Sequence, residues 1–431
     1  MDRRDFLKSA AAIAAAPAVL AQKKPNETIG IAMIGVGTRG YYLFQEFQKI
    51  EGVQIRSICD LYDGNLKRAR EAATNERVKI GKDWEKAMTD PDIDAVVVAT
   101  PDFWHAPMTI RAAEMKKDVY VEKGWSRTLD EAKGMRAAVK RNKTVLQLGH
   151  NYNSMAAFHK ARQIYAEGEL GKVAAIRLYI DRTNAWPEWQ FFQTYEVTEM
   201  PKDASPQTID WARFIANATP RAFDAERFFL WRKWWEYGTG IAGDLMSHLW
   251  DSANMVAGLG IPDSVVTQGG NYFWKDGRDV PDQWNVLMDY PKKELTVSFQ
   301  STFHNRHYSE VEQFLGRDKT MEAGPSFCRT YPAEWKPEYK DRAAKHAQEL
   351  AALGYDPRDL PAVPEYSMKR DELQVSSHWQ NFIDCVRSRE TPRCGVDRAF
   401  EEAATICLSV EAFKRSAKVR WDPASEAIVN A

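Results

Sequence analysis

From Thr28 onward, short apolar runs alternate with longer segments in which apolar residues recur at helical spacing. The apolar runs are typical of buried strands and lie at 29–34, 53–60, 93–100, 118–123 and 144–150. Helical spacing marks the segments 41–50, 107–116 and 129–141 between them. Strands that alternate with helices in this order predict a doubly wound parallel sheet built from βαβ units.

The pattern changes after residue 150. A helix is expected over 154–169, and residues 172–180 then alternate polar and apolar side chains, as in a strand with one covered face. Strand-like runs return at 264–268, 284–290 and 294–300, and helical spacing returns near 339–353, 378–387 and 399–414. We therefore expect an α/β fold, with one domain at 28–150 and a second, α+β domain at 151–431.

The first 21 residues are set apart from this pattern. Arg3 and Arg4 precede an apolar, Ala-rich segment at 10–20, which is too short to span a bilayer comfortably. Paired arginines ahead of such a segment resemble a twin-arginine (Tat) export signal, with cleavage expected after Ala21. The alternative is a buried Ala-rich helix. The signal predicts a periplasmic or otherwise exported protein, with no stable membrane insertion once it is removed.

A glycine-rich turn joins the first apolar run to the first helical segment. It contains Gly35, Gly37 and Gly40, with Thr38 and Arg39 between the last two. The first glycine allows a tight turn, the second lets the backbone approach a pyrophosphate, and the third lets the helix pack on the strand. The N-terminus of the helix attracts the anion. A glycine turn without a ligand is the alternative.

A carboxylate at the end of the second strand supports the dinucleotide interpretation. Asp60 follows Gly40 by 20 residues, which suits an acid that hydrogen-bonds the adenosine ribose. Leu61 and Tyr62 come next, with no arginine to meet a 2′-phosphate, so the sequence favours NAD over NADP. An ordinary turn residue is the alternative for Asp60.

Three further loops follow strands of the parallel sheet, at 100–105, 122–125 and 150–153. Ligands of such sheets bind beyond the carboxyl ends of the strands. Candidate cofactor-binding residues in the first two loops are therefore Thr100, Pro101, His105, Glu122 and Lys123.

A second polar group lies in the later half of the chain. Asp244, His248 and Asp251 are spaced four and three apart, so they can share one helical face. A carboxylate that fixes a histidine tautomer is a common proton-handling arrangement, although a helix-capping Asp and a buried structural His are the alternative. The lack of a third nearby His or Cys argues against zinc.

Composition narrows the choice of partners. The chain has 59 basic and 60 acidic side chains, which does not favour nucleic acid or an anionic membrane. The five cysteines are too scattered for a disulfide framework, although Cys385 and Cys394 could pair. Tryptophans are frequent at 182–235, where Trp186 and Trp189 could line a pocket for a sugar, or the aromatics could simply fill a core.

Together, the glycine turn, Asp60, the Ala-Thr-Pro…His segment at 99–105 and Glu122-Lys123 resemble the Gfo/Idh/MocA oxidoreductase family. The resemblance implies a Rossmann domain, followed by an open and mostly antiparallel sheet through which subunits often pair. It also implies that Lys123 approaches the substrate hydroxyl and the nicotinamide, with His248 as its acid/base partner and Asp244 positioning either the substrate or the lysine. Gly124 departs from the usual proline after that lysine.

The leading functional hypothesis is an NAD-dependent dehydrogenase acting on a sugar, a polyol or a sugar derivative. In this hypothesis Lys123, Asp244, His248, Trp186 and Trp189 contact the substrate. The alternative is a redox-neutral glycoside hydrolase or lyase of the kind that keeps NAD bound, which an export signal would favour. A third possibility is a sugar-binding protein whose Rossmann domain has lost its chemistry.

Overall fold

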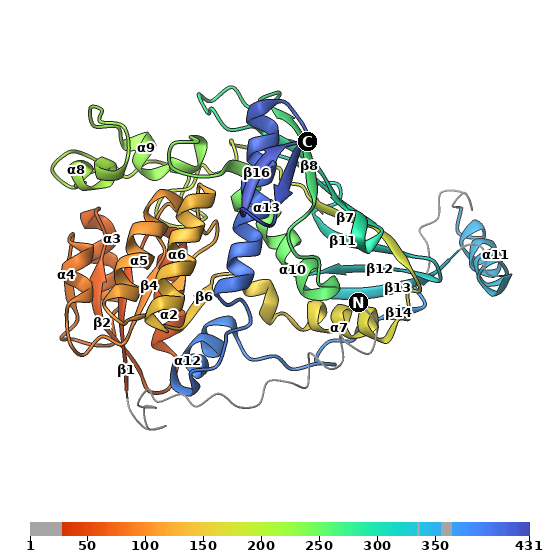
Figure 1. Cartoon of the computed structure of the whole chain (residues 1–431), viewed down its shortest axis with the longest axis horizontal. Helices are drawn as coiled ribbons and strands as arrows, with labels where there is room; N and C mark the ends of the chain where they lie inside the picture. Colours follow the sequence, from red (N-terminus) through yellow and green to blue (C-terminus); the bar gives the residue numbers. More distant parts are fainter. Residues whose placement is uncertain (1–27, 334–336, 355–363) are drawn as a thin grey trace.

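The computed structural model describes residues 28–333, 337–354 and 364–431. The expected export signal at 1–21 lies outside the described residues. Two sheets organise the rest: a parallel sheet near the N-terminus and a larger, mixed sheet that begins at Val173 (Figure 1).

The first sheet has six strands in the order β3-β2-β1-β4-β5-β6, and every pairing in it is parallel. Its strands are β1 (Ile29–Ile34), β2 (Val53–Cys59), β3 (Lys79–Gly81), β4 (Ala95–Val98), β5 (Asp118–Val121) and β6 (Leu146–Leu148). The helices are α2 (Thr38–Gln48), α3 (Asp63–Glu71), α4 (Trp84–Met88), α5 (His105–Glu114) and α6 (Leu129–Asn142). β1, β4 and β5 are fully buried, as expected where helices cover both faces. The predicted doubly wound parallel sheet is confirmed.

The glycine turn is tighter than predicted, because α2 begins at Thr38 and not at residue 41. Gly35 has a φ of +83°, which a side chain would disfavour. A Cβ on Gly40 would lie 2.0 Å from the carbonyl oxygen of Gly35. These two glycines therefore let the helix start directly against the end of β1.

The second sheet has ten strands in the order β14-β13-β12-β11-β7-β10-β9-β8-β15-β16. All neighbours are antiparallel except β7 and β10, so the mostly antiparallel sheet is confirmed. The strands are β7 (Val173–Ile180), β8 (Ser264–Gly270), β9 (Gln283–Tyr290), β10 (Leu295–Thr302), β11 (Glu310–Gly316), β12 (Lys319–Gly324), β13 (Phe327–Pro332), β14 (Tyr366–Ser367), β15 (Val419–Asp422) and β16 (Ala427–Asn430).

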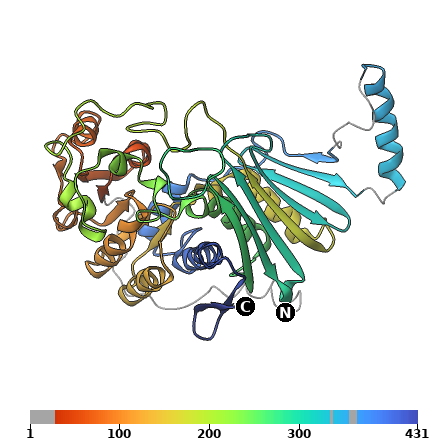
Figure 2. The ribbon, with the colours of Figure 1, turned by 90° about the horizontal axis from the view of Figure 1, so that it is seen from above.

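Helices cover one face of this sheet and leave the other open (Figure 2). Along β9, Val286 and Met288 are buried, whereas Asn285 and Leu287, which alternate with them, are exposed. The α-helices of this half are α7 (Ala156–Glu167), α10 (Ser247–Ala257), α11 (Pro337–Ala351), α12 (His378–Ser388) and α13 (Val396–Arg415). α11 projects away from the sheet in both ribbon views. Contact of the open face with a second copy stays a prediction.

The two sheets share the C-terminal helices. Phe382 of α12 and Phe400 of α13 are buried in clusters that also contain residues of the parallel sheet, and α13 contacts β8 and β15 of the second sheet as well. The division of the chain at residue 150 stays a prediction. Residues beyond 370 pack against the parallel sheet as well as the second sheet, so the second half of the chain contributes to the core of the first domain.

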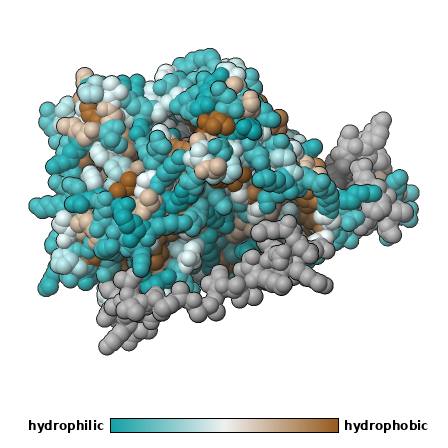
Figure 3. Space-filling view, in the orientation of Figure 1, coloured by the Kyte–Doolittle hydropathy of each residue, from teal (hydrophilic) through white to brown (hydrophobic). Residues whose placement is uncertain are grey.

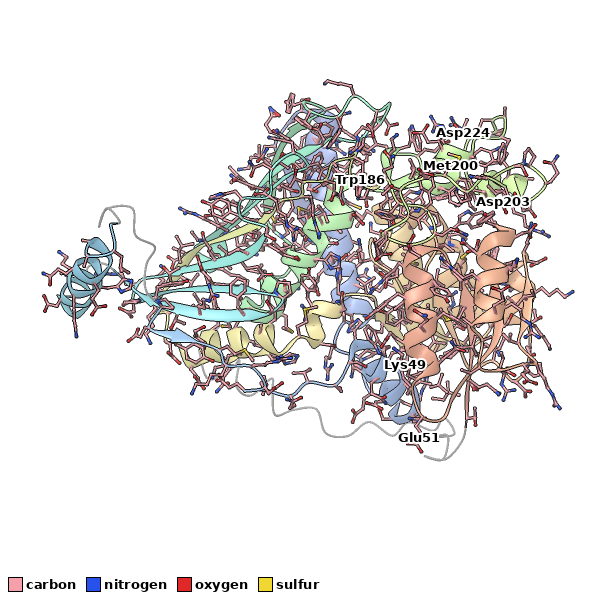
Figure 4. The ribbon with its side chains drawn as sticks, turned by 180° about the vertical axis from the view of Figure 1, so that it is seen from behind. Lys49, Glu51, Trp186, Met200, Asp203 and Asp224 are labelled. Atoms are coloured by element: carbon pink, nitrogen blue, oxygen red, sulfur yellow. The ribbon has the colours of Figure 1, made fainter. Side chains whose placement is uncertain are left out.

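Residues 181–246, here called the capping segment, carry only short helices. These are α8 (Trp211–Phe214), η3 (Ile215–Asn217), α9 (Ala225–Phe229), η4 (Trp231–Lys233) and the π-helix η5 (Ala242–Met246). The remaining 3₁₀ turns of the structure are η1 (Asp102–Trp104), η2 (Asn151–Ser154) and η6 (Pro291–Lys293). In Figure 4, Met200, Asp203 and Asp224 of the capping segment lie at the opposite end of the parallel sheet from Lys49 and Glu51.

Most aromatic residues of the capping segment form a core of their own. Trp211, Phe214, Trp234 and Tyr237 pack with Phe103 of the first domain, which supports the core-filling alternative for these residues. The surface drawn in Figure 3 is mostly hydrophilic, with apolar residues scattered over it. Within the described ranges, no helix is long and apolar enough to cross a bilayer. All five cysteines are buried free thiols.

Candidate active site

A cavity of about 570 Å³ lies between the carboxyl ends of the parallel strands, the capping segment and α10. Its volume falls within the range usual for small-molecule sites. Nearly all of the predicted site residues line it: Gly35, Gly37, Thr38, Arg39, Asp60, Thr100, Pro101, Glu122, Lys123, Trp186, Trp189, Asp244 and His248. Gly40 and His105 do not.

Asp60 closes the end of the cavity nearest the glycine turn. Its Oδ2 accepts the N–H of Val36 at 2.8 Å, and its Oδ1 accepts the N–H of Tyr62 at 2.9 Å and the amide of Asn65 at 3.2 Å. Burial raises the pKa of this carboxyl, against the effect of those hydrogen bonds. Since a carboxylate offers about four acceptor positions, one remains for a ribose hydroxyl.

The remainder of the glycine turn is tied to other segments. Arg39 donates from Nε to Glu122 at 2.8 Å, and the hydroxyl of Thr38 donates to the carbonyl of Phe192 in the capping segment at 2.8 Å. The first N–H groups of a helix have no acceptor within it, and Thr38 and Arg39 line the cavity. The turn therefore fits a pyrophosphate.

His105 supports the cavity wall from behind. Its two ring nitrogens lie 2.9 Å from the carbonyl oxygens of Gly124 and Thr100, and the ring is fully buried. The side chain thus joins the loop after β4 to the loop after β5. The sequence predicted that His105 contacts the cofactor. Instead, its ring contacts the backbone at Thr100 and Gly124, and it thereby helps to hold Thr100 and Lys123 in place.

Lys123 and Asp244 form the central contact between the two halves of the protein. The ammonium of Lys123 donates to Oδ1 of Asp244 at 2.5 Å and to the backbone carbonyl of Asp244 at 2.8 Å. Arg232 also donates to Oδ1, at 3.2 Å, and the indole of Trp189 donates to Oδ2 at 2.7 Å. Burial acts to raise the pKa of Asp244, but Lys123 and Arg232 hold that pKa well below its ordinary value.

Small residues allow this contact. The Lys123–Gly124 peptide is cis, and a Cβ on Gly124 would lie 3.3 Å from the Cα of Gly243. A Cβ on Gly243 would lie 1.7 Å from the hydroxyl oxygen of Thr239. Asp244 follows directly within the π-helix, so the two glycines let this helix pack closely against the chain that carries Lys123.

His248 lies beside this network without joining it. Its ring stacks on Tyr152 at 4.8 Å and meets His150 edge-on at 5.2 Å, and its Nδ1 is buried without a hydrogen-bond partner. The predicted carboxylate support is wrong: Asp244 serves Lys123, and Asp251 binds Asn153 and Arg398. Burial, followed by the charge of Lys123, lowers the pKa of His248 well below 6.5, so the ring is neutral.

The sequence alone did not single out several residues of the cavity. Arg182, Glu188, Arg232 and Arg306 line it, and Tyr152 lies beneath His248. Among the predicted aromatics, Trp186 is 40% exposed and Trp189 is buried against Asp244. The charged residues come from segments without regular spacing, so their convergence leaves no periodic signal in the sequence.

Family comparison agrees with this architecture. Residues 29–150 match the model of the Gfo/Idh/MocA oxidoreductase family, described as an NAD-binding Rossmann fold. Residues 1–19 match the signal sequence of the twin-arginine translocation pathway. The first domain is therefore an NAD-binding domain of the Gfo/Idh/MocA oxidoreductase family, and the chain carries a Tat export signal, as predicted.

Individual relatives match over shorter stretches. The levoglucosan dehydrogenase of Pseudarthrobacter phenanthrenivorans is 33% identical over 140 residues, which is 31% of this chain and 36% of that protein. The alpha-N-acetylgalactosaminidase of Shewanella oneidensis is 31% identical over 159 residues, which is 30% of this chain and 35% of that protein. The matched stretches thus span about a third of each relative's length.

A solved structure shares the fold over nearly the whole length. The WlbA dehydrogenase of Chromobacterium violaceum, in complex with NADH and UDP-GlcNAcA, has a TM-score of 0.67 at 16% identity. The match covers 94% of this chain and 99% of that one. Both sheets, and not only the NAD-binding domain, therefore follow this architecture.

Proposed function

We propose that the protein is an NAD-dependent oxidoreductase acting on a sugar, a polyol or a sugar derivative. The observation that carries the proposal is the pairing of Lys123 with Asp244, in a cavity that also contains the glycine turn and Asp60. The levoglucosan dehydrogenase that resembles this chain acts on a sugar derivative, by its name, which supports the same substrate class.

The cofactor end is proposed to hold NAD through the turn at Gly35, Gly37 and Gly40, with Asp60 at the adenosine ribose. When bound, NAD supplies a carbon that accepts or returns a hydride. The ion pair between Arg39 and Glu122 lies between this end and Lys123, and it fixes the orientation of both loops.

Proton handling falls to Lys123 in this proposal. Two of the three donor positions of its ammonium are used by Asp244, which leaves one for a substrate hydroxyl. In the oxidation, the third position of Nζ first gives up its own proton to solvent and then accepts the hydroxyl proton, while the hydrogen of the same carbon leaves with its electron pair and a carbonyl forms. The neutral ring of His248 is a hydrogen-bonding partner for a neighbouring hydroxyl.

The test begins with the cofactor. The protein is purified, denatured and assayed for released NAD, and the native protein is then supplied with sugars and polyols with and without added NAD. Formation of NADH that depends on the substrate is the expected result. NADH formation that is equal with and without substrate, across a broad panel, would contradict a dehydrogenase.

A redox-neutral glycoside hydrolase that retains NAD is the second candidate. The likeness to the alpha-N-acetylgalactosaminidase and the export signal favour it, because an exported enzyme benefits from a cofactor that is recycled in place. The same preparation distinguishes the two: hydrolysis of a glycoside without added NAD, by protein that releases NAD on denaturation, identifies the hydrolase.

A further inference from the structure

Three arginines converge on the end of the cavity that lies away from the glycine turn. Arg182 follows β7, Arg232 belongs to η4, and Arg306 lies in the loop between β10 and β11. Trp186 lines the same end, and Figure 4 places it where the capping segment meets the large sheet. Segments far apart in the sequence therefore bring positive charge to one place.

Arg182 lies close enough to Glu188 to act on the pKa of that carboxyl, and Arg306 is exposed, but neither side chain forms an ion pair within the described residues. Neither guanidinium forms a hydrogen bond or an ion pair with the part of the chain that the structure describes, and the Nε of Arg182 is buried without an acceptor. A buried donor without a partner costs free energy that a ligand carrying an acceptor would recover. Arg232 differs, because its Nε is taken by Asp244.

The negative charge nearby does not balance these groups. Asp244 is already shared by Lys123 and Arg232, and Asp181 accepts the N–H of Thr302. Glu188 is the remaining carboxyl at this end of the lining; it accepts an amide hydrogen bond from Asn184 at 2.6 Å, and burial raises its pKa while the charge of Arg182 acts to lower it. Guanidinium groups without an ion pair, those of Arg182 and Arg306, thus outnumber the carboxyl groups left at this end of the lining.

We infer that this end of the cavity binds an anionic substituent of the sugar, specifically a carboxylate such as that of a uronic acid. Guanidinium groups bind carboxylates through paired, charge-assisted hydrogen bonds. Trp186 offers an apolar surface for the sugar ring beside them. The inference rests on the proposed function, since it names the substrate class of the same site.

Binding, measured on the NAD-loaded protein, is the test. D-Glucuronate and D-galacturonate are compared with D-glucose and D-galactose by calorimetry, together with D-galactose 6-sulfate. The uronates are expected to bind at least tenfold more tightly than the neutral sugars. In Arg182→Gln the uronate affinity should fall about tenfold or more, with neutral sugars changed less than threefold, and Arg182→Lys should keep part of the preference.

The matched control is Arg177→Gln. Arg177 lies on β7, five residues before Arg182, and is exposed on the open face of the sheet, so its loss should leave both affinities unchanged. Equal or tighter binding of the neutral sugars, or an equal loss of both classes in Arg182→Gln, would overturn the inference. A preference for the 6-sulfate over the uronates would overturn the carboxylate assignment.

Failure of the proposed function has a different signature, because binding needs no turnover. Arg182-dependent uronate binding without any turnover would reject the enzyme and keep the anionic subsite. Turnover of sugars by a protein that binds uronates no more tightly than neutral sugars, with uronate binding unchanged in Arg182→Gln, would reject the subsite and keep the enzyme. Thermal unfolding and NAD content of each variant establish that it is folded and loaded.

Discussion

The two ends of the cavity treat their polar groups differently. At the glycine turn, Asp60 is bonded to Val36, Tyr62 and Asn65, and Arg39 is bonded to Glu122. At the other end, Nδ1 of His248 and Nε of Arg182 are buried without partners. The first end is thus held in shape largely by its own contacts, although Oδ1 of Asn65 is also buried without a partner. At the second end, the unpartnered atoms belong to side chains that form no hydrogen bond within the described residues.

This difference indicates where substitutions should act. Substitutions at the glycine end should lower both the stability of the protein and its NAD content, because the same contacts support the fold and the cofactor site. Changes at the far end should alter turnover or substrate binding while the cofactor stays bound. Lys123 and Asp244 lie where the two ends meet, so they offer the strongest test of this separation.

Lys123→Met should have the largest effect on turnover. Methionine keeps most of the side-chain volume and removes the group that handles the proton, so kcat should fall by about 10²–10⁴-fold while NAD content is nearly unchanged. The measurement is steady-state turnover together with NAD released on denaturation. Lys140→Met, on the exposed side of α6, is the control and should retain both. Loss of NAD from Lys123→Met would show that the two ends are not separable.

Asp244→Asn should follow in size. The substitution leaves Lys123 and Arg232 close together without their shared carboxylate, and removing one partner of a largely buried ion pair costs about 3–5 kcal/mol. We expect a lower thermal midpoint and a loss of turnover. Asp397→Asn, which removes an exposed partner of Lys140, should change stability by less than about 1 kcal/mol. Equal effects in the two variants would contradict the central role of Asp244.

The same contrast explains what the sequence predicted. The glycine turn, Asp60 and the strand ends are local patterns within one domain, and their common edge follows from the parallel sheet. Only the family resemblance linked Asp244 to Lys123, as a group that positions either the substrate or the lysine, and their direct contact depends on the packing of Gly124 against Gly243. Helical spacing joined Asp244 to His248, but the aspartate bonds Lys123, whose ammonium is the nearer and stronger partner.

The arginines at the end of the cavity away from the glycine turn could not be predicted from a local sequence pattern. Arg182 and Arg306 lie in loops after β7 and β10, and they meet because those two strands are the one parallel neighbouring pair in the second sheet. That pairing is a long-range property which periodicity does not encode. The aromatic residues of the capping segment were equally ambiguous, since core and pocket tryptophans have the same composition.

Gly40→Ala sharpens the comparison from the cofactor end. A Cβ there would lie 2.0 Å from the carbonyl oxygen of Gly35, so β1 and α2 must separate, at a cost of about 1–3 kcal/mol. We expect lower stability and at least tenfold weaker NAD binding together. Gly134→Ala in α6 is the control: its Cβ would lie 3.4 Å from Ile110, and higher helix propensity should leave stability equal or greater. Full NAD content in Gly40→Ala would contradict the proposed role of the turn.

His248→Phe should have the smallest effect, and it appears in the pH dependence of stability. The pKa of His248 is lowered in the folded state, so below pH 6.5 the unfolded chain binds a proton that the folded chain does not. Stability from this group is therefore present above pH 6.5 and is lost, by up to about 1.4 kcal/mol per pH unit, as the pH falls toward the folded pKa. Unfolding by urea between pH 5 and 7 should show a smaller loss on acidification in His248→Phe than in the unaltered protein. His378 also loses stability on acidification, because burial lowers its pKa to about 3. It is present in both proteins, so its contribution cancels in the difference between them.

The control is Phe158→Leu, which changes the packing on Tyr152 without removing a titratable group. It should lower stability by the same amount at every pH. Equal slopes for His248→Phe and Phe158→Leu would show that the ring beside Lys123 is protonated at these pH values.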